Sequence, residues 1–152
     1  MNNDINVTGG VKLPERLQRK IAATVNIVND DEPLALTLQE TLNEASPPYL
    51  SRIFTSCQDF ELNAPKAKIL LIDMTMVHRP WQESRIHENM MFWIGKMTEK
   101  HGYGDIIITS GLIEYVPCVA KDLQEYIQDL ARVRYLGVHS GVDSTLLTML
   151  EQ

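Results

Sequence analysis

Residues 67–73 read AKILLID, an aliphatic run that ends on one aspartate. A strand with one wet face would alternate apolar and polar side chains, so the uninterrupted run ILLI indicates a strand buried on both faces. Strands of this kind belong to parallel sheets that are covered by helices on either side. The stretch therefore predicts an α/β protein and places Asp73 at the end of one of its strands.

The rest of the chain alternates between strand-like and helix-like segments. The other predicted strands are residues 23–28, 49–55, 105–110 and 133–138. The predicted helices are residues 33–45, 83–100, 117–132 and 142–150. Residues 56–65 separate the second and third strands and leave room for one weak helical turn. Five strands with right-handed crossovers favour a flavodoxin-like sheet in the order 2-1-3-4-5.

Each predicted helix carries apolar residues at helical spacing, which we expect to pack on the sheet. These residues are Leu34, Leu38, Leu42, Ala45, Ile86, Met90, Trp93, Ile94, Met97, Val119, Leu123, Ile127, Leu130, Leu146, Leu147 and Leu150. Cys57 and Cys118 lie far apart and form no CxxC pair, which argues against a metal ribbon or a redox dithiol. We expect two free, buried thiols.

Composition and charge exclude several classes of protein. The chain has 152 residues, 44% of them hydrophobic and 22% charged, as in one globular domain. Its net charge of −6 and the lack of a long basic run argue against direct nucleic-acid binding. No apolar run could span a bilayer, and the polar start resembles no signal peptide, so we expect no membrane insertion and a cytoplasmic location. We divide the chain into an N-terminal extension with a short helix, residues 1–22, and one domain, residues 23–152.

Acidic residues follow two neighbouring strands of the predicted sheet. Ligands of such sheets bind beyond the carboxyl ends of the strands, where the strand order reverses. The first strand delivers Asp30 and Asp31 to this edge, and its neighbour delivers Asp73. Like charges this close need a cation, and Mg²⁺ takes carboxylates readily, so we expect these three residues to bind Mg²⁺. Alternatively, one of the pair before Pro33 serves only as a helix N-cap.

Three segments resemble the receiver domains of two-component response regulators. Residues 25–33, VNIVNDDEP, are similar to the family's first strand with its acidic pair. Residues 69–76, ILLIDMTM, are similar to the strand that carries the phosphoacceptor in a D-x-x-M pattern. Residues 106–110, IIITS, are similar to the fourth strand with its hydroxyl residue. The resemblance covers about residues 23–151.

The resemblance implies a role for each of these residues. Asp73 is the phosphoacceptor, Asp30 and Asp31 hold Mg²⁺ together with Asp73, and Thr109 hydrogen-bonds a phosphoryl oxygen. The implied partners are a histidine kinase or phosphotransfer protein of a bacterial phosphorelay, a downstream protein and, in some receivers, a second copy. The implied activity is signalling, with no catalysis beyond the domain's own phosphorylation and dephosphorylation. Because the chain ends just after the last predicted helix, we expect a stand-alone domain that acts through protein contacts around its fourth and fifth strands.

The chain also departs from the family's pattern. The family has a Lys followed by Pro at the end of the fifth strand, where this chain has Val138 and His139. Val77 follows Met76, where the family usually has Pro. One alternative is therefore a pseudo-receiver that binds proteins without phosphorylation. Another is a small flavodoxin-like nucleotide-binding enzyme, against which no glycine-rich loop follows the first strand.

Overall fold

The computed structural model describes residues 20–73, 86–110, 116–137 and 142–152. They contain a five-stranded parallel sheet in the order β2-β1-β3-β4-β5. The strands are β1 (Thr24–Val28), β2 (Leu50–Phe54), β3 (Ile69–Asp73), β4 (Asp105–Ser110) and β5 (Arg132–Gly137). The α/β class and the flavodoxin-like strand order 2-1-3-4-5 are thus confirmed.

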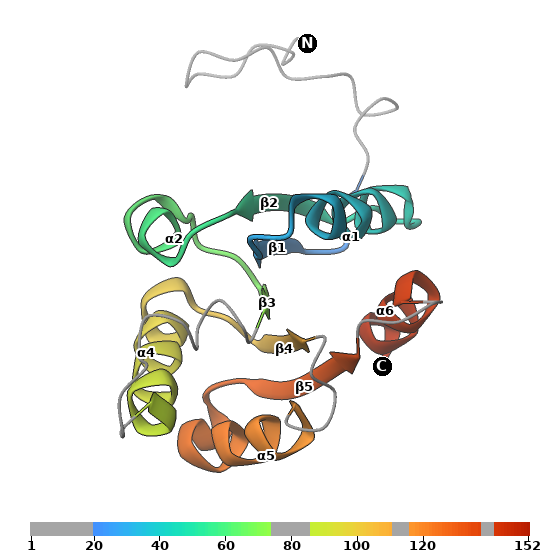
Figure 1. Ribbon diagram of the computed structural model, residues 1–152. Helices are drawn as coiled ribbons and strands as arrows, with labels where there is room; N and C mark the ends of the chain where they lie inside the picture. Colours follow the sequence, from blue (N-terminus) through green and yellow to red (C-terminus); the bar gives the residue numbers. More distant parts are fainter. Residues whose placement is uncertain (1–19, 74–85, 111–115, 138–141) are drawn as a thin grey trace, which may run out of the picture.

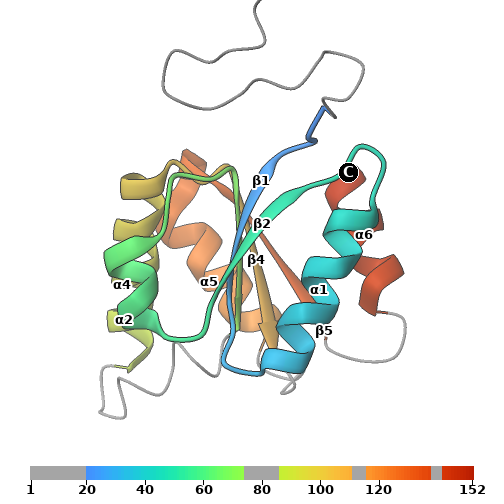
Figure 2. The same cartoon turned by 90° about the horizontal axis from the view of Figure 1, so that it is seen from above.

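Helices cover both faces of the sheet (Figure 1). One face carries α2 (Cys57–Asn63), α4 (Ile86–His101) and α5 (Val116–Ile127), and the other carries α1 (Glu32–Glu44) and α6 (Val142–Glu151). Figure 2 shows the sheet between these two groups. Each face has its own apolar core, because successive side chains of the buried strands point to opposite faces. No helix of the described residues is both long and apolar enough to cross a membrane.

The connection between β2 and β3 holds more helix than the sequence predicts. The single weak turn expected there is a seven-residue helix, α2, whose N-cap Ser56 accepts a hydrogen bond from the N–H of Asp59 at 3.0 Å. Phe60 is fully buried and packs edge-on against Phe54 and Trp93, with ring centroids 5.7 and 5.8 Å away. The prediction was wrong because one buried aromatic residue in two turns makes no periodic stripe.

Two predictions of burial are also wrong. Leu130 is the last of the apolar residues that were predicted to pack on the sheet from α5. It is 50% exposed, because α5 ends at Ile127 and Gln128 takes a φ of 52°. Cys118 is exposed and Cys57 only partly buried, although both are thiols outside any disulfide, as expected. The other apolar helix residues predicted to pack on the sheet, where their side chains are described, are buried or partly buried. The side chains of Ile86 and Met90, and nearly all of the predicted N-terminal helix, lie outside the described residues.

Candidate functional site

Three strands end together and align the residues at the carboxyl edge of the sheet. Val28 of β1 pairs with Ile72 of β3, and Asp73 of β3 pairs with Thr109 of β4. Asn29 follows Val28 and continues the parallel hydrogen bonding, since its N–H donates to the last carbonyl of β2 at 3.0 Å. Asn29, Asp73 and Thr109 therefore form a row across β1, β3 and β4, at a strand spacing of about 4.8 Å.

The row lies on the face of the sheet that α1 and α6 cover. Side chains alternate along a strand, so a residue faces the same way as the residue two positions earlier. The residues two positions before the row all belong to the core beneath α1 and α6: Ile27, Leu71 and Ile107. We will call Asn29, Asp73 and Thr109 the edge row.

Thr109 lies where the sequence analysis requires it, beside Asp73. Its side chain is only 1% exposed, and its hydroxyl donates to the carbonyl of Ile72 at 3.4 Å. This separation is at the long end for an O–H···O hydrogen bond, so the hydroxyl is weakly held. Asp73 is partly exposed. The structure thus places a weakly held hydroxyl next to an accessible carboxylate.

Asp31 serves as the N-cap of α1. Its Oδ1 accepts a hydrogen bond from the N–H of Leu34 at 3.1 Å. Asp31 therefore caps α1 through one carboxylate oxygen, and whether it serves only as a cap is not decided by this contact. Asp30 is exposed and lies between this cap and the edge row. Metal binding by Asp30, Asp31 and Asp73 stays a prediction.

Asn29 is the residue of this edge that the sequence analysis missed. It is 1% exposed, and its Oδ1 accepts a hydrogen bond from the N–H of Asp31 at 2.9 Å. Its Nδ2 is buried and has no hydrogen-bond partner in the described part of the chain. The sequence analysis considered only the acidic residues Asp30 and Asp31 after the first strand. Asn29 directly follows Val28 as Asp73 directly follows Ile72, and aligning these last apolar residues of the two strands would have found it.

The carboxylates at this edge offer limited ligands for a cation. Within the described ranges, no group of three or more His, Cys, Asp or Glu could hold a metal ion. One carboxylate oxygen of Asp31 accepts a hydrogen bond from α1, and the side of Asn29 that has no partner among the described residues is an N–H donor, which cannot ligate a cation. The carboxylates of Asp30 and Asp73 and the second oxygen of Asp31 are the oxygen ligands that this edge could offer, and one or two carboxylates fit Mg²⁺, which keeps several waters.

Several residues of the predicted site lie outside the described residues. They are Met76, Val77, Val138 and His139. The cysteine nearest to the site does not suit thiol chemistry: burial first, and then the negative charges of Glu61 and Asp30, raise the pKa of Cys57 to about 11. Its thiol is therefore protonated and a poor nucleophile at neutral pH.

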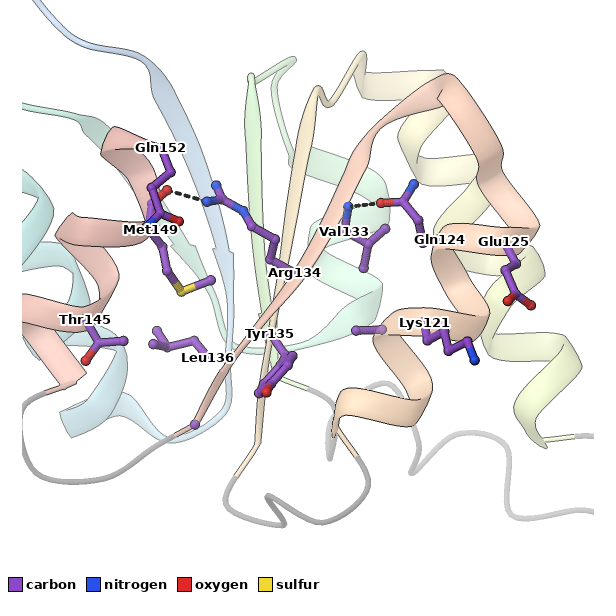
Figure 3. Close-up of a pocket in the computed structure, with 12 residues that line it drawn as sticks. Lys121, Gln124, Glu125, Val133, Arg134, Tyr135, Leu136, Thr145, Met149 and Gln152 are labelled. Carbon is purple, nitrogen blue, oxygen red and sulfur yellow. Dashed lines mark hydrogen bonds between the residues drawn. The ribbon is translucent and has the colours of Figure 1, made fainter.

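A pocket of about 770 Å³ lies at β5, the strand next to the edge row (Figure 3). Lys121 and Gln124 line it from α5, Tyr135 from β5 and Met149 from α6. Its described lining does not include Asp30, Asp31, Asp73 or Thr109. It is part of the surface around the fourth and fifth strands, where the sequence analysis expects protein contacts.

Comparison with known proteins identifies the fold. No family model and no curated protein matches the chain. A response regulator receiver protein from Pseudoalteromonas atlantica superposes with a TM-score of 0.59 at 11% identity, covering 85% of this chain and 94% of that one. A response regulator from Burkholderia pseudomallei, with a phosphorylated aspartic acid, calcium ion and citrate, gives 0.57 at 18% identity and covers 81% and 64%. HP1043, an orphan response regulator of H. pylori, gives 0.55 at 10% identity and covers 86% and 95%. This chain therefore has the fold of the response-regulator receiver domains, as its sequence resemblance predicted.

Proposed function

We propose that this chain is a receiver-type signalling domain whose phosphoacceptor is Asp73. The observation that carries the proposal is the edge row, in which Asp73 lies beside Thr109 at the carboxyl edge of the sheet. The row lies next to the point where the strand order reverses, between β1 and β3. The phosphorylated aspartic acid in the structure from B. pseudomallei shows that a response regulator of this fold can carry the modification.

The proposed chemistry is transfer of a phosphoryl group to a carboxylate. A carboxylate oxygen of Asp73 attacks the phosphorus of a phosphohistidine, the P–N bond breaks, and its electrons leave with the imidazole of the kinase or phosphotransfer protein. Thr109 exchanges its weak bond to Ile72 for a phosphoryl oxygen. Asp30, Asp31 and Asp73 would hold Mg²⁺, which supplies charge neutralisation for the phosphoryl oxygens when it is bound.

The output of such a domain is a contact with another protein. We place this contact on the surface made by α5, β5 and α6, where Tyr135 lines the pocket and is about half exposed, at 46%. An exposed aromatic side chain at a hollow surface suits a protein interface. We further propose that the chain works in the cytoplasm and catalyses nothing beyond its own phosphorylation and dephosphorylation.

A pseudo-receiver is the second candidate, and one observation favours it specifically. The position beside Asp73 in the edge row is an amide, Asn29, and the nearby Asp31 caps a helix. The amide carries no negative charge, and the cap occupies one carboxylate oxygen of Asp31, so fewer oxygen atoms at this edge are left for a cation. In this alternative the chain has the same fold, and its surface around β5 binds a partner without any change caused by phosphorylation.

Phosphorylation by a small donor separates the two candidates. The full chain is incubated with millimolar Mg²⁺ and acetyl phosphate, and its intact mass is measured. We expect the mass of one phosphoryl group to be gained, to be lost in Asp73→Asn, and to be kept in Asp129→Asn, a matched change at an exposed residue of the turn after α5. No mass gain, together with no fluorescence response to beryllofluoride, would leave the pseudo-receiver.

A further inference from the structure

The two outer strands of the sheet, β2 and β5, are protected to different degrees by their own helices (Figure 1). At β5 the side-chain amide of Gln124 accepts a hydrogen bond from the N–H of Val133 at 2.7 Å and donates one to the carbonyl of Ala131 at 2.9 Å. At β2 the contact of this kind is longer, from Nε2 of Gln39 to the carbonyl of Ser51 at 3.3 Å. Since an unpaired edge strand can accept a further strand, the weaker contact leaves β2 less protected against such pairing.

The backbone groups of β2 point alternately toward β1 and away from the sheet. The N–H of Leu50 and the carbonyl of Phe54 each hydrogen-bond to a residue that flanks β1, at 3.0 Å. Neighbouring residues of a strand direct their backbone groups to opposite sides, so those of Ser51 and Ile53 point away from β1. Among the described residues, the N–H and C=O of Ile53 have no hydrogen-bond partner. They are available to water or to a further strand.

A small groove lies beside this edge, between α1 and β2. It has a volume of about 210 Å³ and is lined by Glu32, Leu36, Ile53 and Thr55. Small-molecule pockets have volumes of roughly 300–1,000 Å³, so this groove suits a side chain better than a whole ligand. Leu36 is 51% exposed, and Leu50, at the start of β2, is 57% exposed. Exposed apolar side chains beside an unpaired strand edge are typical of a surface to which an extended segment binds.

The charges next to the groove indicate the chemistry of such a segment. Glu32 and Glu40 lie four residues before and after Leu36 on α1, so all three share one face of the helix. Both glutamates are exposed, and neither has an ion-pair partner in the part of the chain that the structure describes. A strand with apolar side chains near Leu36 and basic side chains near the two glutamates would complement this face.

A second copy of this chain fits the edge poorly. Two identical β2 strands pair about a two-fold axis, which would set their two α1 helices antiparallel on the same face of the joined sheet. With Leu36 of both copies near the axis, Glu32 of each copy would face Glu40 of the other. Like charges across an interface weaken binding, and each copy already has a net charge of −6. The charge pattern therefore favours a different protein.

We propose that the edge of β2 binds an extended segment of a partner protein, which adds to the sheet as a further strand and carries apolar side chains flanked by basic ones. Backbone hydrogen bonds to Ile53 supply affinity, the groove takes alternate side chains, and Glu32 and Glu40 select basic residues. The edge of β2 lies at the other end of the sheet from β5. The inference therefore goes beyond the output surface proposed above and does not depend on phosphorylation.

The test uses two synthetic peptides with blocked ends, KTVTVTK and ETVTVTE, which differ only in their charged residues. Each is titrated into the ¹⁵N-labelled full chain at low salt, and the backbone amides are followed by NMR. We expect KTVTVTK to shift the amide of Ile53 and to slow its exchange with solvent, and to leave the amide of Tyr135 at the β5 edge unchanged. ETVTVTE should bind about tenfold more weakly, and high salt should reduce the difference, because exposed charge pairs are screened.

Two charge-exchange variants provide the matched comparison. Glu32→Lys/Glu40→Lys should reverse the preference, so that ETVTVTE binds more tightly than KTVTVTK. Glu99→Lys/Glu125→Lys has the same net charge, but its changes lie at exposed residues of α4 and α5, so it should prefer KTVTVTK as the wild type does. Circular dichroism checks that both variants are folded.

The proposal is overturned if neither peptide shifts the amide of Ile53 at millimolar concentration, or if folded Glu32→Lys/Glu40→Lys still prefers KTVTVTK. A shift at Tyr135 without one at Ile53 would place the peptide on the other edge and also overturn it. If the Ile53 amide moves as the chain alone is concentrated, the occupant is a second copy instead. The two peptides compared on the wild-type chain decide the proposal even if the variant at Glu32 and Glu40 does not fold.

Discussion

At the scale of single residues, His101 is a base that the fold keeps away from water. It is 4% exposed, and its ring lies between those of Phe60 and Tyr103, with centroids 5.5 and 5.6 Å away. Burial first, and then the positive charges of Lys100 and Lys66, lower the pKa of His101 below 6.5. In acid the unfolded chain therefore binds a proton more readily than the folded chain does.

The first prediction concerns the pH dependence of stability. The contribution of His101 is fully present above the unfolded pKa of 6.5 and is lost as the pH falls below it. Urea unfolding of the wild type should show a free energy of unfolding that decreases between about pH 7 and about pH 5. His101→Phe keeps the ring contacts and should show a smaller decrease. Equal decreases in both proteins would contradict the prediction.

The second prediction distinguishes the two thiols. Cys118 is exposed, whereas Cys57 is partly buried and has a pKa of about 11. Because the thiolate is the reactive form, iodoacetamide at about pH 8 should modify Cys118 first. Cys118→Ser should leave only slow labelling, and Cys57→Ser should leave the fast labelling unchanged. Equal rates in these two variants, followed by mass spectrometry, would refute the assignment.

At the scale of elements, the start of α1 depends on Asp31 as a hydrogen-bond acceptor. The third prediction is that Asp31→Ala lowers the free energy of unfolding by about 1 kcal/mol, because it removes the acceptor for the N–H of Leu34. Asp31→Asn keeps an acceptor and removes the charge, so its stability in Mg²⁺-free buffer should stay close to that of the wild type. Urea denaturation of both variants gives the comparison. An Asn variant as unstable as the Ala variant would mean that the charge of Asp31 matters more than its cap.

At the scale of the whole molecule, two apolar cores share one sheet. Phe60 is fully buried in the core beneath α2, α4 and α5, so the fourth prediction is that Phe60→Ala lowers the free energy of unfolding by about 3–5 kcal/mol. Leu62 lies on the same short helix and is 74% exposed, so Leu62→Ala should change it by no more than about 0.5 kcal/mol.

The shared sheet also predicts that the two cores unfold together. In a Trp81→Phe variant, tryptophan fluorescence reports on Trp93 in the first core alone, and its unfolding transition should coincide with that measured by far-UV circular dichroism. Separate transitions would show that the core beneath α1 and α6 stays folded after the core beneath α2, α4 and α5 has unfolded.

The sequence alone was sufficient for the features that rest on local patterns. The runs ending at Ile72 and Ile108 are apolar on both faces, so they indicate buried parallel strands whatever the rest of the chain does. The positions of Asp73 and Thr109 at the ends of two such strands follow from the same runs. Helix α2 and the exposure of Leu130 could not be predicted from local patterns. A single buried ring, that of Phe60, and a single residue with a positive φ, Gln128, leave no periodic signal in the sequence.

The tertiary structure decided which residue lies beside Asp73. The sequence analysis predicts that Asp30 and Asp31 lie beside Asp73, because both follow the first strand. The pairing of Val28 with Ile72 instead puts Asn29 there and leaves Asp31 to cap α1. Counting from the last apolar residue of each strand suggests this offset of one or two residues, but only the alignment of two strands far apart in the chain fixes it. The sequence therefore determined the sheet and the acidic character of its edge, and the register between β1 and β3 determined which side chains meet there.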